Sequence, residues 1–110
     1  MPEADRLGTA AVHILVALGS EERHGYSIMR EVEALSDGRM RLAPGTLYTN
    51  IKRLLTAGLI EESEERPDPA LDDERRRYYR LTDAGRSAVA AEVVRMEALV
   101  ARTRPWLEHP

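Results

Sequence analysis

The sequence predicts a mostly α-helical protein with a small β-hairpin, folded as a winged helix-turn-helix with one further helix at the C-terminus. Three stretches of helical periodicity come first, two short β-like segments follow, and one long helical stretch comes last. This is the order of elements in a winged helix. We therefore expect a winged helix-turn-helix over residues 1–82 and a C-terminal dimerisation helix and tail over residues 83–110.

The first two predicted helices are amphipathic. The first covers about residues 5–18, where Gly19 interrupts the pattern, and the second covers about residues 24–36, where Asp37-Gly38 ends it. Between them, Ser20-Glu21-Glu22-Arg23 is expected to form a charged turn. The apolar face of the first helix is formed by Leu7, Ala11, Ile14, Leu15 and Leu18, and that of the second by Ile28, Met29, Val32 and Leu35.

The third predicted helix begins near Pro44, which suits a first helical position, and ends at about Ala57, before Gly58. Its apolar face is formed by Leu47, Ile51, Leu54 and Leu55. The opposite face holds Gly45, Thr46, Thr49, Lys52 and Arg53, with Tyr48 and Asn50 on the flanks. Because this outer face has hydrogen-bond donors and cations but no carboxylate, it is suited to an anionic partner.

The hairpin is predicted from two β-like segments, residues 59–65 and 76–81, with a turn-rich loop between them. Thr82 is a good N-cap for the last helix. We expect that helix to end at about Arg104, because Pro105 cannot donate the next backbone hydrogen bond.

The charge of the chain is unevenly distributed, although the net charge is −3. Residues 39–58 contain four cations and no acid, and residues 75–80 contain another four cations and no acid. Residues 59–74, between them, contain eight acids and one arginine. The two basic segments fall on the second half of the helix-turn-helix and on the outgoing hairpin strand, which are the two places where a winged helix meets DNA.

The size and composition exclude several classes of protein. At 110 residues the chain has the size of a single domain, and it contains no cysteine, so it has neither a disulfide nor a thiolate metal site. The acidic N-terminus lacks the features of a signal peptide, and the apolar run over residues 10–18 is too short to cross a bilayer. We therefore expect a cytoplasmic protein with no membrane partner.

Several motifs resemble the PadR family of bacterial transcriptional regulators, over about residues 10–86. They are His24-Gly25-Tyr26, Leu42-Ala43-Pro44-Gly45-Thr46-Leu47-Tyr48, Lys52-Arg53-Leu54, Gly58-Leu59-Ile60, Arg76-Arg77-Tyr78-Tyr79-Arg80-Leu81-Thr82 and Gly85. The single C-terminal helix is similar to that of the small-form members. The resemblance implies a winged-helix repressor that binds a two-fold operator as a homodimer and is released by a small hydrophobic or aromatic effector.

Three groups of residues are candidates for contact with double-stranded DNA. The family resemblance assigns Tyr26 to the DNA backbone, and packing alone is the alternative role for this residue. The groove face of the third helix can contact bases, and a solvated polar face is the alternative. The wing arginines can contact phosphates, and pairing with nearby acids is the alternative. The groove face comprises Thr46, Thr49, Asn50, Lys52 and Arg53, and the wing arginines are Arg75, Arg76 and Arg77. Tyr48 flanks the apolar face and matches the leucine-tyrosine pair of the family, which favours a backbone or base-edge contact, with core packing as the alternative.

The last helix has the spacing of a seam between two chains. Its apolar positions follow a 4-3-4-3 pattern, so we expect it to form a homodimer as well as to pack against the first helix of its own chain. Part of this seam is also a candidate effector site, although packing is the simpler role of its methionine. The seam comprises Val89, Val93, Met96, Val100 and Thr103, and the candidate effector site comprises Val93, Met96 and Val100.

No residue pattern predicts catalysis, a metal site or a cofactor. His24 has no histidine at ligand spacing, so a turn or helix-capping role is expected for it. The sequence therefore predicts a sequence-specific DNA-binding transcriptional regulator that is not an enzyme. The alternative is a winged-helix module that binds another protein through its acidic segment, residues 61–74.

Overall fold

The computed structural model describes residues 7–63 and 77–108, and in these two ranges it is mostly helical with one small antiparallel sheet. The elements are α1 (Thr9–Gly19), β1 (Arg23–His24), α2 (Gly25–Leu35), α3 (Pro44–Thr56), β2 (Ile60–Glu62), β3 (Tyr78–Leu81) and α4 (Asp83–Glu108). The order of helices and strands confirms the predicted winged helix-turn-helix class with a C-terminal helix.

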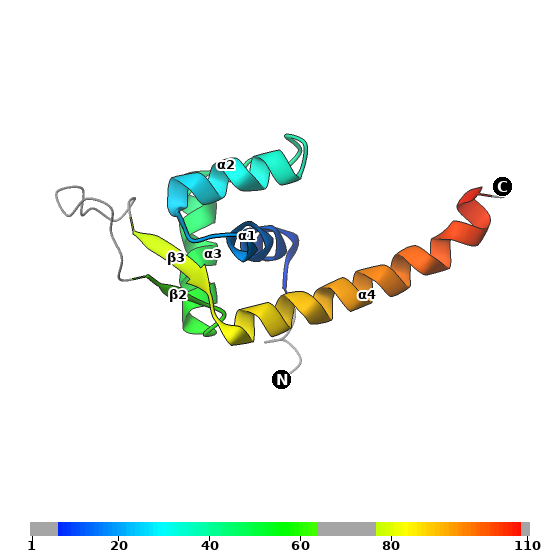
Figure 1. Ribbon diagram of the computed structural model, residues 1–110. Coiled ribbons are helices and arrows are strands. Elements are labelled where there is room, and N and C mark those ends of the chain that lie inside the picture. The colour runs from blue at the N-terminus through cyan, green and yellow to red at the C-terminus, as the bar shows by residue number, and fades with distance from the viewer. Residues whose placement is uncertain (1–6, 64–76, 109–110) are drawn as a thin grey trace.

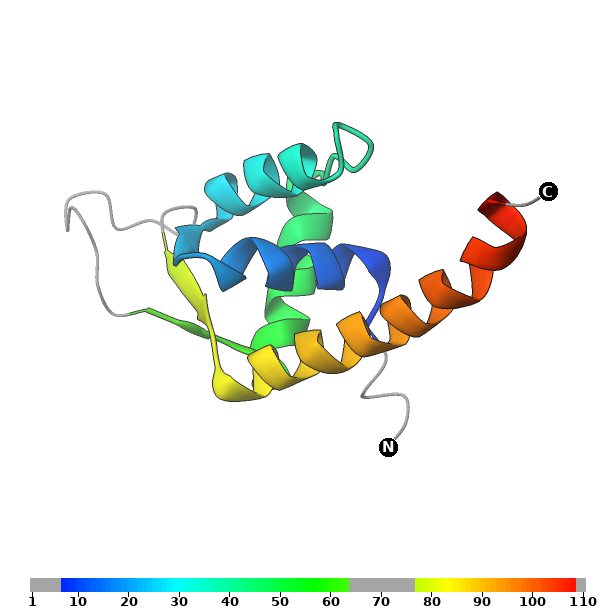
Figure 2. The same ribbon diagram turned by 45° about the vertical axis from the view of Figure 1, so that its right-hand side comes forward.

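The helices surround α1, and the sheet lies at one end of them. In Figures 1 and 2, α1 runs between α2 and α4, while α3 crosses the body at a steep angle to α1. The start of α4 lies beside the body, and the rest of this helix extends away from it, so that the C-terminal end stands far from the sheet.

The core is formed by apolar residues from each of the first three helices and from the sheet. Ile14, Leu15, Ile28, Val32, Leu47 and Ile51 are buried in the helical part, and Ile60 and Tyr79 are buried in the sheet. Two residues expected on apolar faces are instead exposed, Leu35 by 44% and Leu55 by 38%. Leu35 is the last residue of α2, and Leu55 is turned by about 100° from the buried Leu54, so neither faces the other helices.

The sheet has a strand that the sequence analysis missed. The predicted two-stranded hairpin is the pair β2 and β3, and β1 adds a third strand, in the order β1-β3-β2. In β1, Arg23 pairs with Tyr79 and His24 pairs with Tyr78. The sequence analysis places Arg23 in a turn and His24 at the start of the second helix. A two-residue strand is too short to produce an alternating pattern, and its partner β3 is more than fifty residues away.

Two predicted helix ends are wrong. The first helix begins at Thr9 and not at residue 5, although residues 1–6 lie outside the described part. The last helix passes Pro105 and ends at Glu108. Proline removes one hydrogen bond and kinks a helix near its end without stopping it, and the last turns of α4 bend in Figure 2.

A close contact fixes the start of α4 against the turn between α3 and β2. Thr82 caps α4, because its Oγ1 accepts a hydrogen bond from the Gly85 amide at 3.0 Å, and this hydroxyl donates to the Gly58 carbonyl at 2.6 Å. Gly85 is buried, and a Cβ at this position would overlap the carbonyl oxygen of Leu59. A glycine is therefore required where α4 meets the backbone.

We expect the substitution Gly85→Ala to lower the free energy of unfolding by roughly 1–3 kcal/mol, because the added methyl group must displace the backbone. Urea unfolding at one fixed protein concentration measures this change. Gly45→Ala is the matched control, because a Cβ there meets nothing within 4 Å, and it should leave stability equal or higher by up to about 1 kcal/mol. Equal destabilisation by both substitutions would contradict the contact.

Candidate nucleic-acid interface

The outer face of α3 is polar and exposed, as its sequence predicts. Ala43 is the N-cap and Pro44 occupies the first turn, so the helix starts without a side-chain cap. Leu47, Ile51 and Leu54 are buried on the inner face. The opposite face presents exposed side chains at Thr46, Thr49, Lys52 and Arg53. A helix held on its body by one apolar stripe can thus offer its other side to a partner.

Two of the predicted contact residues on α3 already have partners inside the protein. The side-chain amide of Asn50 donates a hydrogen bond to the Thr46 carbonyl at 2.9 Å. To read an adenine through that amide, Asn50 must first exchange this bond. Tyr48 is half-buried and packs on the core. Its ring lies against Gly25, where a Cβ would overlap the phenol, so Tyr48 holds the start of α2 close to α3.

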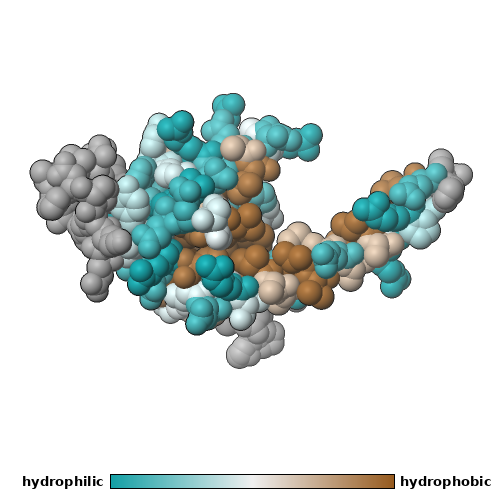
Figure 3. All heavy atoms as spheres, viewed as in Figure 1, coloured by the Kyte–Doolittle hydropathy of each residue, from teal (hydrophilic) through white to brown (hydrophobic). Residues whose placement is uncertain are grey.

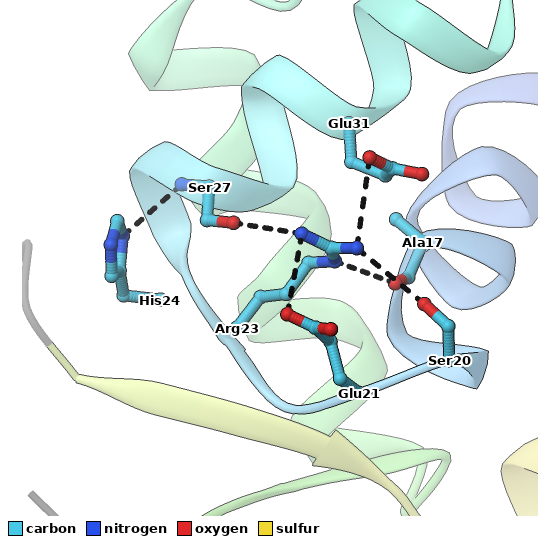
Figure 4. A network of polar contacts seen from close by, with 7 residues as sticks. All are labelled: Ala17, Ser20, Glu21, Arg23, His24, Ser27 and Glu31. Carbon is cyan, nitrogen blue, oxygen red and sulfur yellow. Dashed lines mark hydrogen bonds and ion pairs between the residues drawn. The ribbon is translucent and has the colours of Figure 1, made fainter.

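The turn between α1 and α2 is organised around Arg23, whose side chain is 15% exposed. Figure 4 shows that its guanidinium points into the angle between the two helices. Nε donates to the Ala17 carbonyl at 2.9 Å and Nη1 donates to Ser27 Oγ at 3.0 Å. Glu21 and Glu31 lie 3.9 Å and 3.6 Å away as ion-pair partners. One side chain therefore joins the end of α1 to the first turn of α2.

His24 caps α2, which confirms the role expected for it. Its Nδ1 accepts a hydrogen bond from the Ser27 amide at 3.1 Å. The imidazole also meets the edge of Tyr78 with 5.4 Å between ring centroids. Since β1 ends at His24 and α2 begins at Gly25, this cap connects the sheet directly to the helix-turn-helix.

Tyr26 is on the exposed side of α2 and is 58% exposed. Its ring lies nearly parallel to that of His24, with 6.5 Å between centroids. The guanidinium of Arg30 lies over the same ring, 5.9 Å from its centroid. Sequence analysis did not select Arg30, although its position one helical turn after Tyr26 was a usable signal.

The described arginines of the wing are paired with carboxylates. Arg77 lies 3.4 Å from Glu62, and Arg80 lies 2.8 Å from Glu61 and 3.6 Å from Glu22. The hydrogen bond from Arg80 to Glu61 and the charge of that carboxylate raise the pKa of the Arg80 guanidinium above its ordinary value. Arg75 and Arg76 lie outside the described residues.

The cations without a carboxylate partner are found elsewhere in the described ranges. Arg77 and Arg80 in the wing are engaged in ion pairs, and Arg41 pairs with Glu33 at 3.3 Å. Within residues 7–63 and 77–108, the cations outside any ion pair are Arg30, Arg39, Lys52 and Arg53 on the helix-turn-helix, and Arg86 and Arg102 on α4. The uncompensated positive charge therefore concentrates around α2 and α3.

The acidic segment considered as a protein-docking surface is described only at residues 61–63. There, Glu61 and Glu62 are engaged by Arg80 and Arg77, and Ser63 is buried. These two carboxylates are therefore already neutralised within the molecule. Residues 64–74 lie outside the described part.

The predicted seam on α4 is apolar and mostly exposed in the single chain. Val89 packs on the core, whereas Val93, Met96 and Val100 are 40%, 43% and 47% exposed. The Thr103 hydroxyl donates to the Val100 carbonyl at 2.7 Å. Figure 3 shows hydrophobic residues along α4 that continue onto the adjoining body. An open hollow of about 500 Å³ on this helix is lined by Val93, Met96, Glu97, Val100, Ala101 and Arg104.

The end of α4 leaves large apolar side chains exposed. Trp106 and Leu107 are each 62% exposed. The helix has left the body before this point, as Figures 1 and 2 show.

Within residues 7–63 and 77–108, no helix is both long enough and apolar enough to cross a membrane. No group of three or more histidine, aspartate or glutamate side chains there is arranged to hold a metal ion.

Comparisons with known proteins identify similar chains. A family model described as the transcriptional regulator PadR-like family matches residues 14–91, more than half of the chain. The transcriptional regulator Rv3488 of Mycobacterium tuberculosis is 39% identical over 88 residues, which cover 80% of this chain and 76% of the relative.

Solved structures show the same fold. A PadR family transcription regulator from Clostridium difficile R20291 aligns with a TM-score of 0.73 at 22% identity, over 91% of this chain and 99% of the other. RosR of H. salinarum aligns with a TM-score of 0.66 at 30% identity, over 93% of this chain and 97% of the other. The likeness extends over both the winged helix-turn-helix and the C-terminal helix.

Proposed function

Because the chain belongs to the PadR-like family of transcriptional regulators, and is a DNA-binding regulator and not an enzyme, we propose that it is a ligand-responsive repressor that binds a two-fold operator as a homodimer. The observation that carries the proposal is the outer face of α3, where Lys52 and Arg53 are exposed and make no ion pair within the described ranges. In this proposal α3 enters the major groove and the wing lies on the minor groove or the backbone.

The composition of α3 supports its role as the recognition helix. Its 13 residues include no acid, so nothing on it repels phosphate. Arg53 can pair with the acceptor atoms of guanine, and Thr46 and Thr49 can meet thymine methyl groups. The half-buried Tyr48 and the α2 contact beneath it hold this face at a constant angle to the body. Rigid presentation of the donors favours sequence discrimination.

The exposed seam of α4 supports the homodimer. Val93, Met96 and Val100 leave an apolar stripe in water, and a second copy of the same stripe would cover it in a two-fold arrangement. One recognition helix reads only a few base pairs, so a two-fold operator requires two copies. In this arrangement residues 83–110 form the dimerisation segment and residues 1–82 the DNA-binding segment.

The hollow on α4 supports an effector site at the same seam. The apolar part of its lining, Val93, Met96 and Val100, suits a hydrophobic or aromatic compound. Because the hollow is open and one helix alone lines it, a second copy of α4 would have to close it around a ligand. Methionine side chains repack easily around ligands of different shape. A ligand here would alter the angle between the two copies and hence the spacing of their recognition helices.

The groove face predicts that substitution of a base-contacting residue lowers sequence preference in DNA binding, whereas substitution of a distant residue does not. We expect Arg53→Ala to reduce the preference for the operator over unrelated duplexes by about 1–3 kcal/mol, because one base contact is lost. Fluorescence anisotropy on the footprinted operator and on a scrambled duplex measures this preference. Arg102→Ala, an exposed and unpaired arginine on α4, is the control and should bind both as wild type does. If Arg53→Ala kept the wild-type preference for the operator, the assignment of α3 to the major groove would be wrong.

The ion pair at the wing predicts that a carboxylate restrains DNA binding. Glu62→Gln releases Arg77, so affinity for any duplex should increase at low salt, and the salt slope should steepen by about 0.9 if Arg77 then meets one phosphate. Anisotropy between 50 and 200 mM salt measures both. Glu108→Gln breaks the pair with Arg104, 3.5 Å away at the far end of α4, and should change neither. An unchanged slope in Glu62→Gln would exclude Arg77 from the interface.

The α4 seam predicts a dimer that one charge disrupts. Met96→Glu places a carboxylate against its own copy across the two-fold axis, so the protein should become monomeric while remaining helical. Light scattering coupled to size-exclusion chromatography gives the mass, and circular dichroism checks the fold. Val94→Glu introduces the same charge at an exposed position beside the seam and should remain dimeric. A dimeric Met96→Glu protein would place the interface elsewhere.

A further inference from the structure

We propose that Arg30 and Tyr26 on α2 form a clamp for a phosphate of the DNA backbone, separate from the base-reading face of α3. This inference rests on the proposed function, since the phosphate belongs to the duplex that α3 binds. It adds Arg30 to the interface and gives Tyr26 a second task, which is to hold the guanidinium in place.

The geometry of the clamp is a stack of flat groups on the outside of α2. Tyr26 and Arg30 are four residues apart, so they lie one above the other on the helix surface. The guanidinium carbon is 5.9 Å from the ring centroid, within the range of a cation–π contact. The ring itself is supported by the nearly parallel imidazole of His24. A guanidinium that lies over a ring and makes no other polar contact keeps its N–H donors available for an anion.

The carboxylates of α2 are engaged by other arginines, which leaves Arg30 uncompensated. Glu31 lies 3.6 Å from Arg23, and Glu33 lies 3.3 Å from Arg41. Glu31 is therefore engaged before the start of α2, and Glu33 is engaged in the connection between α2 and α3. In the described part of the chain Arg30 makes no ion pair and no side-chain hydrogen bond, and its guanidinium lies over the tyrosine ring.

The position of the clamp fits a phosphate beside the groove that α3 enters. Gly25, the first residue of α2, is in contact with the Tyr48 ring on α3. Tyr26, the next residue, therefore lies where α2 and α3 are closest to each other, and Arg30 lies one turn further along α2. In a helix-turn-helix the first of the two helices crosses the sugar-phosphate backbone while the second reads base edges. A fixed cation on α2 would set the depth and register of α3.

The test is the salt dependence of DNA binding by Arg30→Ala. Loss of one phosphate contact should reduce the magnitude of the salt slope by about 0.9, equally on the operator and on a scrambled duplex. Between 50 and 200 mM salt, the variant should therefore lose about 3.5-fold less affinity than wild type. Arg102→Ala is the matched control and should keep the wild-type slope. Thermal unfolding should show that both variants remain folded.

The role of the ring is tested by combining substitutions. Tyr26→Phe keeps the stacking surface, so Arg30→Ala should reduce the slope as much in that background as in wild type. Tyr26→Ala removes the surface, so Arg30→Ala should then have a smaller effect. If Arg53→Ala loses sequence preference but Arg30→Ala keeps the wild-type salt slope, the clamp is overturned and the proposed function is not. Absence of salt-dependent DNA binding by the wild-type protein overturns both the clamp and the proposed function.

Discussion

The fold depends on the partly buried guanidinium of Arg23. A charge with so little exposure must have its hydrogen bonds satisfied, and here the partners come from the end of α1 and the first turn of α2. The backbone of the same residue pairs with Tyr79 in the central strand. Arg23 therefore contributes both to the angle between the first two helices and to the attachment of the wing. His24 extends this junction into α2 by capping the helix.

Electrostatics distinguish the described part of the wing, whose arginines are paired with glutamates, from a cationic helix-turn-helix. The exposed pairs that Arg77 and Arg80 make with glutamates add little to stability, because solvent screens them. Their larger consequence is for the surface potential, since each removes a cation from the described face of the wing. The cations near α2 and α3 are left uncompensated. A chain with a net charge of −3 can in this way present a positive surface to a polyanion.

The last helix combines two environments along one length. Its first turns are held by Thr82 and Gly85 against the turn between α3 and β2, and Val89 packs on the core. Beyond that point the helix leaves the body with apolar side chains in water (Figures 1 and 3). An unpartnered apolar stripe of this kind is unfavourable for an isolated chain, which is why a second copy is the simplest cover for it.

The sequence by itself determined the order of the helices, the polar outer face of α3 and three of the four residues of its apolar face, the cap at Thr82 and the family, because these follow from local periodicity and from motifs at short spacing. Tertiary structure decided which cations stay uncompensated. Arg80 meets Glu22 and Glu61, and Arg77 meets Glu62, through strand pairings between distant segments. It also decided the strand β1 and the exposure of Leu35. Local patterns cannot show such features, since each depends on what the fold places opposite a residue and not on its neighbours along the chain.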